Sequence, residues 1–292
     1  MRNASIVVLF ALMGCAQAAY ADRDFRQSVA ADAKGTVTIN NTAGSVRVMG
    51  WDRNEVLVEG KLEEDVERVD VESSGARTSI KVVLPRRSRN GGAELDIRVP
   101  RGSEVEITTV SADVNVQDVL GEQRLRSVSG DIVTQVAGAD VDLKTVSGDV
   151  ELRASGKPVE VRASTVSGDF TLRRGAGSLE ITTVSGDVEA ELDPARSVRV
   201  RTTSGDVHFK GRLARNASVN FESISGELEI DAPAEAGFSY DVKSFSGDIE
   251  TCFGMNTGGS GNRGNVIVGK RGEGAAEIRA RTMSGGIRLC DQ

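Results

Sequence analysis

Thr-Val-Ser-Gly-Asp stands at residues 145–149, again at 165–169 and a third time at 183–187. Its core, Ser-Gly-Asp or a close variant, recurs along the chain. A degenerate copy, Ser-Ala-Asp, begins at Ser111. Successive copies are 18 to 21 residues apart, except that the last gap is 38 residues. A period of this length indicates one supersecondary unit per copy. The repeated glycines are Gly130, Gly148, Gly168, Gly186, Gly205, Gly226, Gly247 and Gly285.

The residues around the motif fall into columns when the copies are aligned on the Ser. Apolar residues recur four positions before it and three after it, as at Leu125 and Ile132 around Ser129. A Ser or Thr recurs two positions before it. This alternation predicts two short strands per repeat, joined at a Ser-Gly corner. We expect the Gly to supply the positive φ of a tight corner.

Two architectures fit such a unit, a chain of antiparallel hairpins and a solenoid with one coil per repeat. The charged columns favour the solenoid, because their signs alternate from copy to copy and stacking would place them about 4.8 Å apart. The sequence therefore predicts an all-β, single-stranded, parallel β-helix-like fold, right-handed by default. The alternation is clear six residues after the Ser, at Arg173, Glu191, Lys210 and Asp231.

The repeats suggest a division of the chain. Residues 111–292 are expected to form the Ser-Gly-Asp solenoid, with a Gly-rich insertion at 254–274 that explains the doubled gap. Residues 36–110 alternate less regularly and predict irregular β coils, and residues 22–35 predict a polar N-terminal arm.

The N-terminus reads as an export signal. Residues 6–13 form a short apolar core, too short to span a bilayer, and Ala19-Tyr20-Ala21 offers a cleavage site after residues 1–21. A competing interpretation is a lipobox ending at Cys15, which would make the chain an outer-membrane lipoprotein. We expect a periplasmic or secreted protein without a transmembrane span. The 43 acidic residues outnumber the 36 Lys and Arg, which disfavours nucleic acid as a partner.

The chain resembles the bacterial family of β-strand-repeat putative adhesins, domain of unknown function 4097. The resemblance rests on residues 40–48 with Gly50-Trp51-Asp52, on the Val-Pro-Arg-Gly run at 99–102 and on the Thr-Val-Ser-Gly-Asp copies. It covers roughly residues 35–291 and implies a parallel β-helix-like fold in the cell envelope. It brings no catalytic residues.

The acidic column is the sharpest candidate for a ligand site, because stacked carboxylates could bind Ca²⁺. The simpler interpretation is that each Asp accepts hydrogen bonds from backbone N–H groups of its own corner. Repulsion between stacked acids is only about 1 kcal/mol in water, so no metal is required. The column consists of Asp131, Asp149, Asp169, Asp187, Asp206, Glu227 and Asp248.

Other side chains offer weaker candidates. His208 is the sole His and shares a column with glutamates, which indicates a surface residue. Without a second His or a Cys cluster, zinc and Cys–His chemistry are disfavoured. Trp51 could stack on a sugar, but a Trp in the core or at an end cap is commoner. The Ser and Thr columns are expected to form a hydrogen-bonding ladder along the coils.

The column positions also predict a disulfide. Cys252 and Cys290 each lie six residues after a marker Ser, so they share a column, and two cysteines remain after cleavage at Ala21. If residues 254–274 are an insertion, the two coils are adjacent and the Cα atoms lie about 4.8 Å apart, within disulfide range. We expect both thiols to face outward and the bond to hold the C-terminal coil, which we expect to be the outermost one, with no neighbour on its outer side.

These observations predict a non-enzymatic envelope scaffold or adhesin-like module, with no cofactor, that presents its surface to an envelope protein or a cell-surface glycan. The alternative is a carbohydrate-active, polysaccharide lyase-like enzyme, which rests on fold analogy.

Overall fold

The computed structural model describes residues 23–85, 91–233, 237–252, 260–261 and 264–291. Every regular element within these ranges is a β-strand, in agreement with the all-β prediction. The predicted signal segment 1–21, which includes Cys15, lies outside the described residues. Nowhere in the described ranges does a helix occur that is long and apolar enough to cross a membrane.

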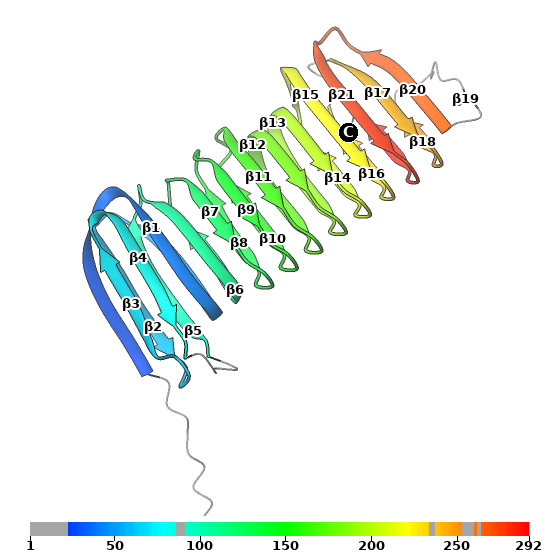
Figure 1. Cartoon of the computed structure of the whole chain (residues 1–292). Coiled ribbons are helices and arrows are strands. Elements are labelled where there is room, and N and C mark those ends of the chain that lie inside the picture. Colours follow the sequence, from blue (N-terminus) through cyan, green and yellow to red (C-terminus); the bar gives the residue numbers. More distant parts are fainter. Residues whose placement is uncertain (1–22, 86–90, 234–236, 253–259, 262–263, 292) are drawn as a thin grey trace, which may run out of the picture.

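The strands stack into two hydrogen-bonded ladders, which form the two faces of an elongated stack (Figure 1). We call them ladder A and ladder B. In spatial order, ladder A contains β3 (Arg68–Ser73), β4 (Gly75–Val83), the middle of β1 (Arg23–Trp51), the first half of β6 (Glu104–Gln117), β7 (Gln123–Arg126), β9 (Val141–Lys144), β11 (Val159–Ser164), the second halves of β12 (Phe170–Thr182) and β13 (Val188–Arg201), β15 (Leu213–Ser223), β21 (Ala276–Thr282), β17 (Phe238–Ser244), β20 (Gly264–Arg271) and β19 (Ser260–Gly261).

Ladder B is built from the other strand of each coil, again given in spatial order. It contains the start of β1, β2 (Glu55–Leu62), β5 (Ala93–Pro100), the end of β1, the second half of β6, β8 (Ile132–Val136), β10 (Val150–Ala154), the first halves of β12 and β13, β14 (Val207–Lys210), β16 (Leu228–Asp231), β22 (Ile287–Cys290) and β18 (Ile249–Thr251).

Consecutive repeats pair in parallel, with equivalent residues opposite each other. Val150, for example, pairs with Ile132 of the preceding copy and with Phe170 of the following one. The hairpin alternative is therefore wrong. The alternating charges face each other as predicted, since Arg162 pairs in register with both Asp142 and Glu180.

The core lies between the two ladders. Alternate residues of each strand point inward, and the inward columns are almost entirely apolar and buried. Phe209 of ladder B and Phe221 of ladder A meet across this core, with ring centroids 5.6 Å apart. Because each side chain packs on those of the coils above and below, one repeat alone could not bury its apolar surface.

The order of the coils in space differs from their order in the sequence at the C-terminal end. The Ser284 coil, formed by β21 and β22, pairs on one side with β15 and β16 and on the other with β17 and β18. Figure 1 shows β21 lying between β15 and β17. The expectation that the C-terminal coil is the outermost one is therefore wrong, because the Ser246 coil occupies that position.

The N-terminal end shows the same kind of exchange. The middle and end of β1 lie between the coil of β4 and β5 and the coil of β6, although β1 comes first in the sequence. Residues 23–30 pair antiparallel with β2, so the expected polar arm at 22–35 is instead part of a strand from Arg23 onward.

Both ends of the stack limit the exposure of open strand edges. Antiparallel strands cover the outermost coils, β3 on β4 at one end and β20 on β17 at the other. The other outer strand at the C-terminal end, β18, has three residues. Covering an edge or shortening it blocks pairing with further chains. The predicted insertion at 254–274 thus contributes the covering strand β20, while much of its first half lies outside the described residues.

Candidate functional site

The Ser-Gly-Asp corners lie one above another where ladder A passes into ladder B, and we call this line of corners the marked edge. The corner glycines do not have positive φ, contrary to our expectation; Gly44, at the corner of β1, is the exception with a φ of 97°. Glycine is needed because the coils approach closely. A Cβ on Gly148, Gly168 or Gly205 would lie 2.0–2.1 Å from a glycine carbonyl oxygen of the adjacent coil.

The Ser or Thr two positions before each marker Ser is buried, and in the coils from Ser129 to Ser225 it closes the corner. Its hydroxyl oxygen accepts the N–H of the corner glycine, as from Gly130 to Ser127 at 2.9 Å and from Gly168 to Thr165 at 3.1 Å. These bonds join residues within one coil. The predicted ladder between coils is therefore wrong for most of this column, apart from contacts such as Thr109 to Ser127 at 3.1 Å. It is confirmed for the marker serines, whose hydroxyls donate to the adjacent coil, as from Ser129 to the carbonyl of Val110 at 3.2 Å.

The acidic column forms a hydrogen-bonded ladder from coil to coil. The backbone N–H of Asp149 donates to Oδ1 of Asp131 at 2.9 Å, and that of Asp169 donates to Oδ1 of Asp149 at 2.9 Å. The same bond joins Asp187 to Asp169, Asp206 to Asp187 and Glu227 to Asp206, at 2.8–2.9 Å. Each carboxylate thus serves the next coil rather than its own corner. Gly286 interrupts the column before Asp248.

This ladder accounts for the aspartates without a metal ion, because each bonded carboxylate already has a donor. Within the described residues, no three His, Cys, Asp or Glu side chains are grouped so that they could hold a metal ion.

The residue immediately before each marker Ser forms an exposed apolar column along the marked edge. Its valines are 44–47 % exposed and Phe245 is 62 % exposed, whereas the apolar columns four before and three after the Ser are mostly buried. The candidates named from the sequence do not include this column. The members in spatial order are Val110, Val128, Val146, Val166, Val184, Thr203, Ile224, Met283 and Phe245.

A basic column lies beside the apolar one on ladder A, three residues before each marker Ser. Its basic members are Arg126, Lys144, Arg201, Lys243 and Arg281, its acidic member is Glu222, and its uncharged members are Thr108, Ser164 and Thr182. Arg201 and Glu222 form an ion pair at 3.1 Å. Hydrogen bonds from Asn220 and Arg201 hold the pKa of Glu222 below its ordinary value.

The marked edge therefore presents four exposed columns in chain order. They are basic, apolar, serine and acidic, and they run from ladder A around the corner to ladder B. The marker serines support the edge, since Ser129 donates its backbone N–H to the carbonyl of Val110 at 2.8 Å and Ser147 to that of Val128 at 2.9 Å.

The remaining candidates lie away from the marked edge. His208 is part-exposed on ladder B, and its Nδ1 lies 3.0 Å from Oε2 of Glu229, which also pairs with Arg288 at 2.6 Å. Trp51 is half-buried near the N-terminal end, where its Nε1 donates to the carbonyl of Glu55 at 2.9 Å. The guanidinium of Arg53 lies 4.9 Å from its ring centroid.

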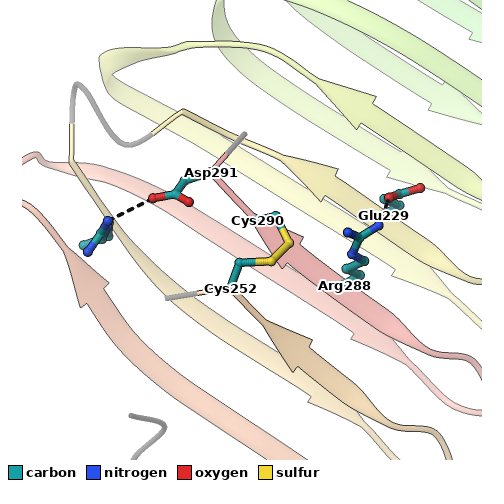
Figure 2. Close-up of a disulfide and its surroundings, with 6 residues drawn as sticks. Glu229, Cys252, Arg288, Cys290 and Asp291 are labelled. Carbon is teal, nitrogen blue, oxygen red and sulfur yellow. Dashed lines mark hydrogen bonds and ion pairs between the residues drawn. A yellow bond between two sulfur atoms is a disulfide. The ribbon is translucent and has the colours of Figure 1, made fainter. Parts of the chain in front are cut away.

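Cys252 and Cys290 form the predicted disulfide, with their Cα atoms 4.9 Å apart (Figure 2). The prediction that the two coils are adjacent is confirmed. The prediction that both sulfurs face outward is wrong for Cys290, which is fully buried, whereas Cys252 is exposed. The bond joins the outermost coil to the inserted C-terminal coil.

Solved structures that match this chain include proteins of two bacteria. A putative lipid binding protein from Parabacteroides distasonis has a TM-score of 0.51 at 11 % identity, with 91 % of this chain and 96 % of that chain covered. A putative adhesin from the same organism has a TM-score of 0.47 at 11 % identity, covering 91 % and 97 %. A putative cell adhesion protein from Clostridium sporogenes has a TM-score of 0.26 at 11 % identity, covering 92 % and 99 %.

Comparison with curated proteins finds no match. A family profile does match, over residues 36–216 and again over 178–289. These two ranges take in almost all of the described stack, including the marked edge. The chain belongs to the Toastrack DUF4097 family.

Proposed function

We propose that the protein is a non-enzymatic scaffold of the cell envelope, an adhesin-like module that binds a macromolecule along the marked edge of a right-handed β-solenoid. The observation that carries this proposal is the exposed apolar column. It continues through consecutive coils between columns of polar residues. Exposed apolar patches rimmed by polar groups are typical of interaction surfaces.

The repeat also suits a long contact better than a small-molecule site. Stacked coils repeat the same side chains at about 4.8 Å, so one surface chemistry extends along the whole stack. The glycines of the corners hold this spacing, because the backbones touch there. An extended partner, either an envelope protein or a cell-surface glycan, would therefore meet a similar set of columns at most coils.

The proposed location in the cell envelope rests on the predicted signal segment. We propose that residues 1–21 direct export and are removed, which leaves a periplasmic or secreted protein. Attachment of a lipid at Cys15 would place the same module on the outer membrane.

In-cell photo-crosslinking tests the binding surface. A photoreactive amino acid at Val146, on the marked edge, is expected to form covalent adducts with a macromolecule. The same probe at Leu120, which is 51 % exposed near the opposite edge, serves as the matched control. Adducts at position 146 that are absent at position 120 support the proposal, and the absence of adducts at 146 contradicts it.

The rival function is tested separately. Incubating the purified protein with acidic polysaccharides is expected to generate no new unsaturated ends. Any turnover would show that the chain is an enzyme.

A further inference from the structure

The two sides of the marked edge carry opposite charges. On one side of the apolar column, the basic column carries five Lys or Arg, three Ser or Thr and one Glu. On the other side, the acidic column carries an Asp or Glu in every coil from Asp113 to Glu227. A partner that covered the whole edge would need an apolar stripe with acids on one side and bases on the other.

The chain itself carries that complementary surface. We propose that the macromolecule bound at the marked edge is a second copy of this chain, related by a two-fold axis parallel to the stack. This inference rests on the proposed function, of which it names the partner. Rotation about such an axis exchanges the two sides of the edge and keeps every coil at its own level. It therefore places bases against acids and the apolar column against itself.

The alternative two-fold arrangement is disfavoured by charge. A two-fold axis running across the edge would reverse the direction of the second stack. The basic column would then face the basic column of the second copy, and the acidic column would face the acidic column. Acids would then meet acids along ladder B, and like charges placed together across an interface cost energy. Complementarity thus selects the parallel dimer, with an isologous contact.

The parallel arrangement pairs specific side chains. Arg126 would face Asp131 of the second copy, Lys144 would face its Asp149, and Arg201 would face its Asp206. All of these side chains are exposed in the single chain. The one like-charged pair would be Glu222 with Glu227. The apolar column would be covered along its whole length, from Val110 to Phe245.

The size of the edge is sufficient for a dimer of modest affinity. Nine coils at about 4.8 Å give a length of about 38 Å, and the five steps between the six residues from the basic to the acidic column, at no more than about 3.3 Å each, give a width of at most about 17 Å around the corner. The area is therefore at most about 650 Å² per copy, or about 1,300 Å² in total. This upper limit lies above the roughly 1,000 Å² expected of a specific interface.

Cysteine crosslinking of the purified mature protein tests the arrangement. In the parallel dimer each residue of the apolar column faces its own counterpart, so Val128→Cys and Ile224→Cys should each form disulfide-linked dimers under mild oxidation. When the two variants are mixed as chains of different length, no hybrid of the two should form. Leu120→Cys, near the opposite edge, is the control and should remain monomeric.

The charges are tested by a second pair of variants. Arg126→Glu with Lys144→Glu should weaken dimerisation by about tenfold or more in sedimentation, because bases that face acids are replaced. Lys157→Glu with Arg196→Glu makes the same change in net charge on exposed residues outside the marked edge and should leave the dimer intact. Equal effects of both pairs would contradict the proposed contacts.

The outcomes separate this inference from the proposed function. Hybrid disulfides between positions 128 and 224 would overturn the parallel arrangement, and a monomer at every concentration would overturn the second copy as partner. If the purified protein is monomeric while position 146 crosslinks to another macromolecule in cells, the second copy is wrong and the proposed function stands. If neither experiment yields an adduct, both fail.

Discussion

Gly168 lies so close to Gly148 that a Cβ on Gly168 would be 2.0 Å from the carbonyl oxygen of Gly148. Real Cβ atoms do not approach backbone oxygen this closely, so Gly168→Ala must push two coils apart in the middle of the stack. We expect a loss of well over 1 kcal/mol in the free energy of unfolding, larger than an ordinary Gly→Ala change. Urea denaturation of the purified variant measures it.

Gly156→Ala is the matched control. Gly156 has a φ of 79°, and a Cβ on this residue would meet nothing within 4 Å, so the substitution adds left-handed strain but no clash. That strain costs about 1–2 kcal/mol. A Gly168→Ala variant as stable as Gly156→Ala would show that close approach is not the reason for the corner glycines.

Thr165→Val tests the hydrogen bond that closes the corner. Valine keeps the shape of Thr165 but removes the oxygen that accepts the buried N–H of Gly168 at 3.1 Å. Leaving that N–H without a partner should cost about 1–3 kcal/mol. Thr165→Ser keeps the oxygen, as Ser127 does naturally, and should lose much less. Equal losses in the two variants would assign the effect to packing.

The acidic ladder predicts different results for two substitutions at Asp149. Asp149→Ala removes the oxygen that accepts the N–H of Asp169 and should cost about 0.5–1.5 kcal/mol. Asp149→Asn keeps an acceptor and removes repulsion of about 1 kcal/mol from neighbouring acids, so it should match the wild type or exceed it. Urea denaturation of the two variants compares them. A larger loss of unfolding free energy in Asp149→Asn than in Asp149→Ala would contradict this account.

A chelator provides the complementary experiment on the same column. Because the bonded carboxylates already accept backbone N–H groups, EDTA should leave the melting temperature nearly unchanged. A large drop that Ca²⁺ restores would show that the column binds metal.

The columns could be derived from the sequence because the repeat fixes the phase of every strand. That phase predicted the parallel pairing of Val150 with Phe170 and the match of Cys252 with Cys290. It also contained the signal for the exposed column. Val128 is an odd number of residues from the buried Leu125, so strict alternation already turns it outward.

The order of the coils could not be derived in this way. Alignment on the marker Ser shows that two coils have the same shape but not which coils are neighbours. The Ser284 coil can enter between the Ser225 and Ser246 coils because all three present equivalent strand edges. The choice depends on the connection through β20, whose antiparallel pairing covers the outer edge of β17. Column alignment contains no information about that pairing.

The disulfide gives the last prediction, because it joins the two coils whose order is exchanged. Cys252 belongs to the outermost coil, which has a partner on one side only, and Cys290 belongs to the coil inserted beneath it. The bond closes a loop with a sequence separation of 38 residues. Constraining a loop of this length in the unfolded chain is worth about 4 kcal/mol in the chain-entropy account.

Replacing both residues by alanine, Cys252→Ala with Cys290→Ala, should therefore lower the free energy of unfolding by about 3–4 kcal/mol. Hydrogen exchange should accelerate first in β18 and β22, because the end of the stack can then open without the central coils. Reductant should bring the wild type to the stability of the double variant and leave that variant unchanged. Two free thiols in denatured, unreduced wild-type protein, or a double variant as stable as the oxidised wild type, would contradict the assignment.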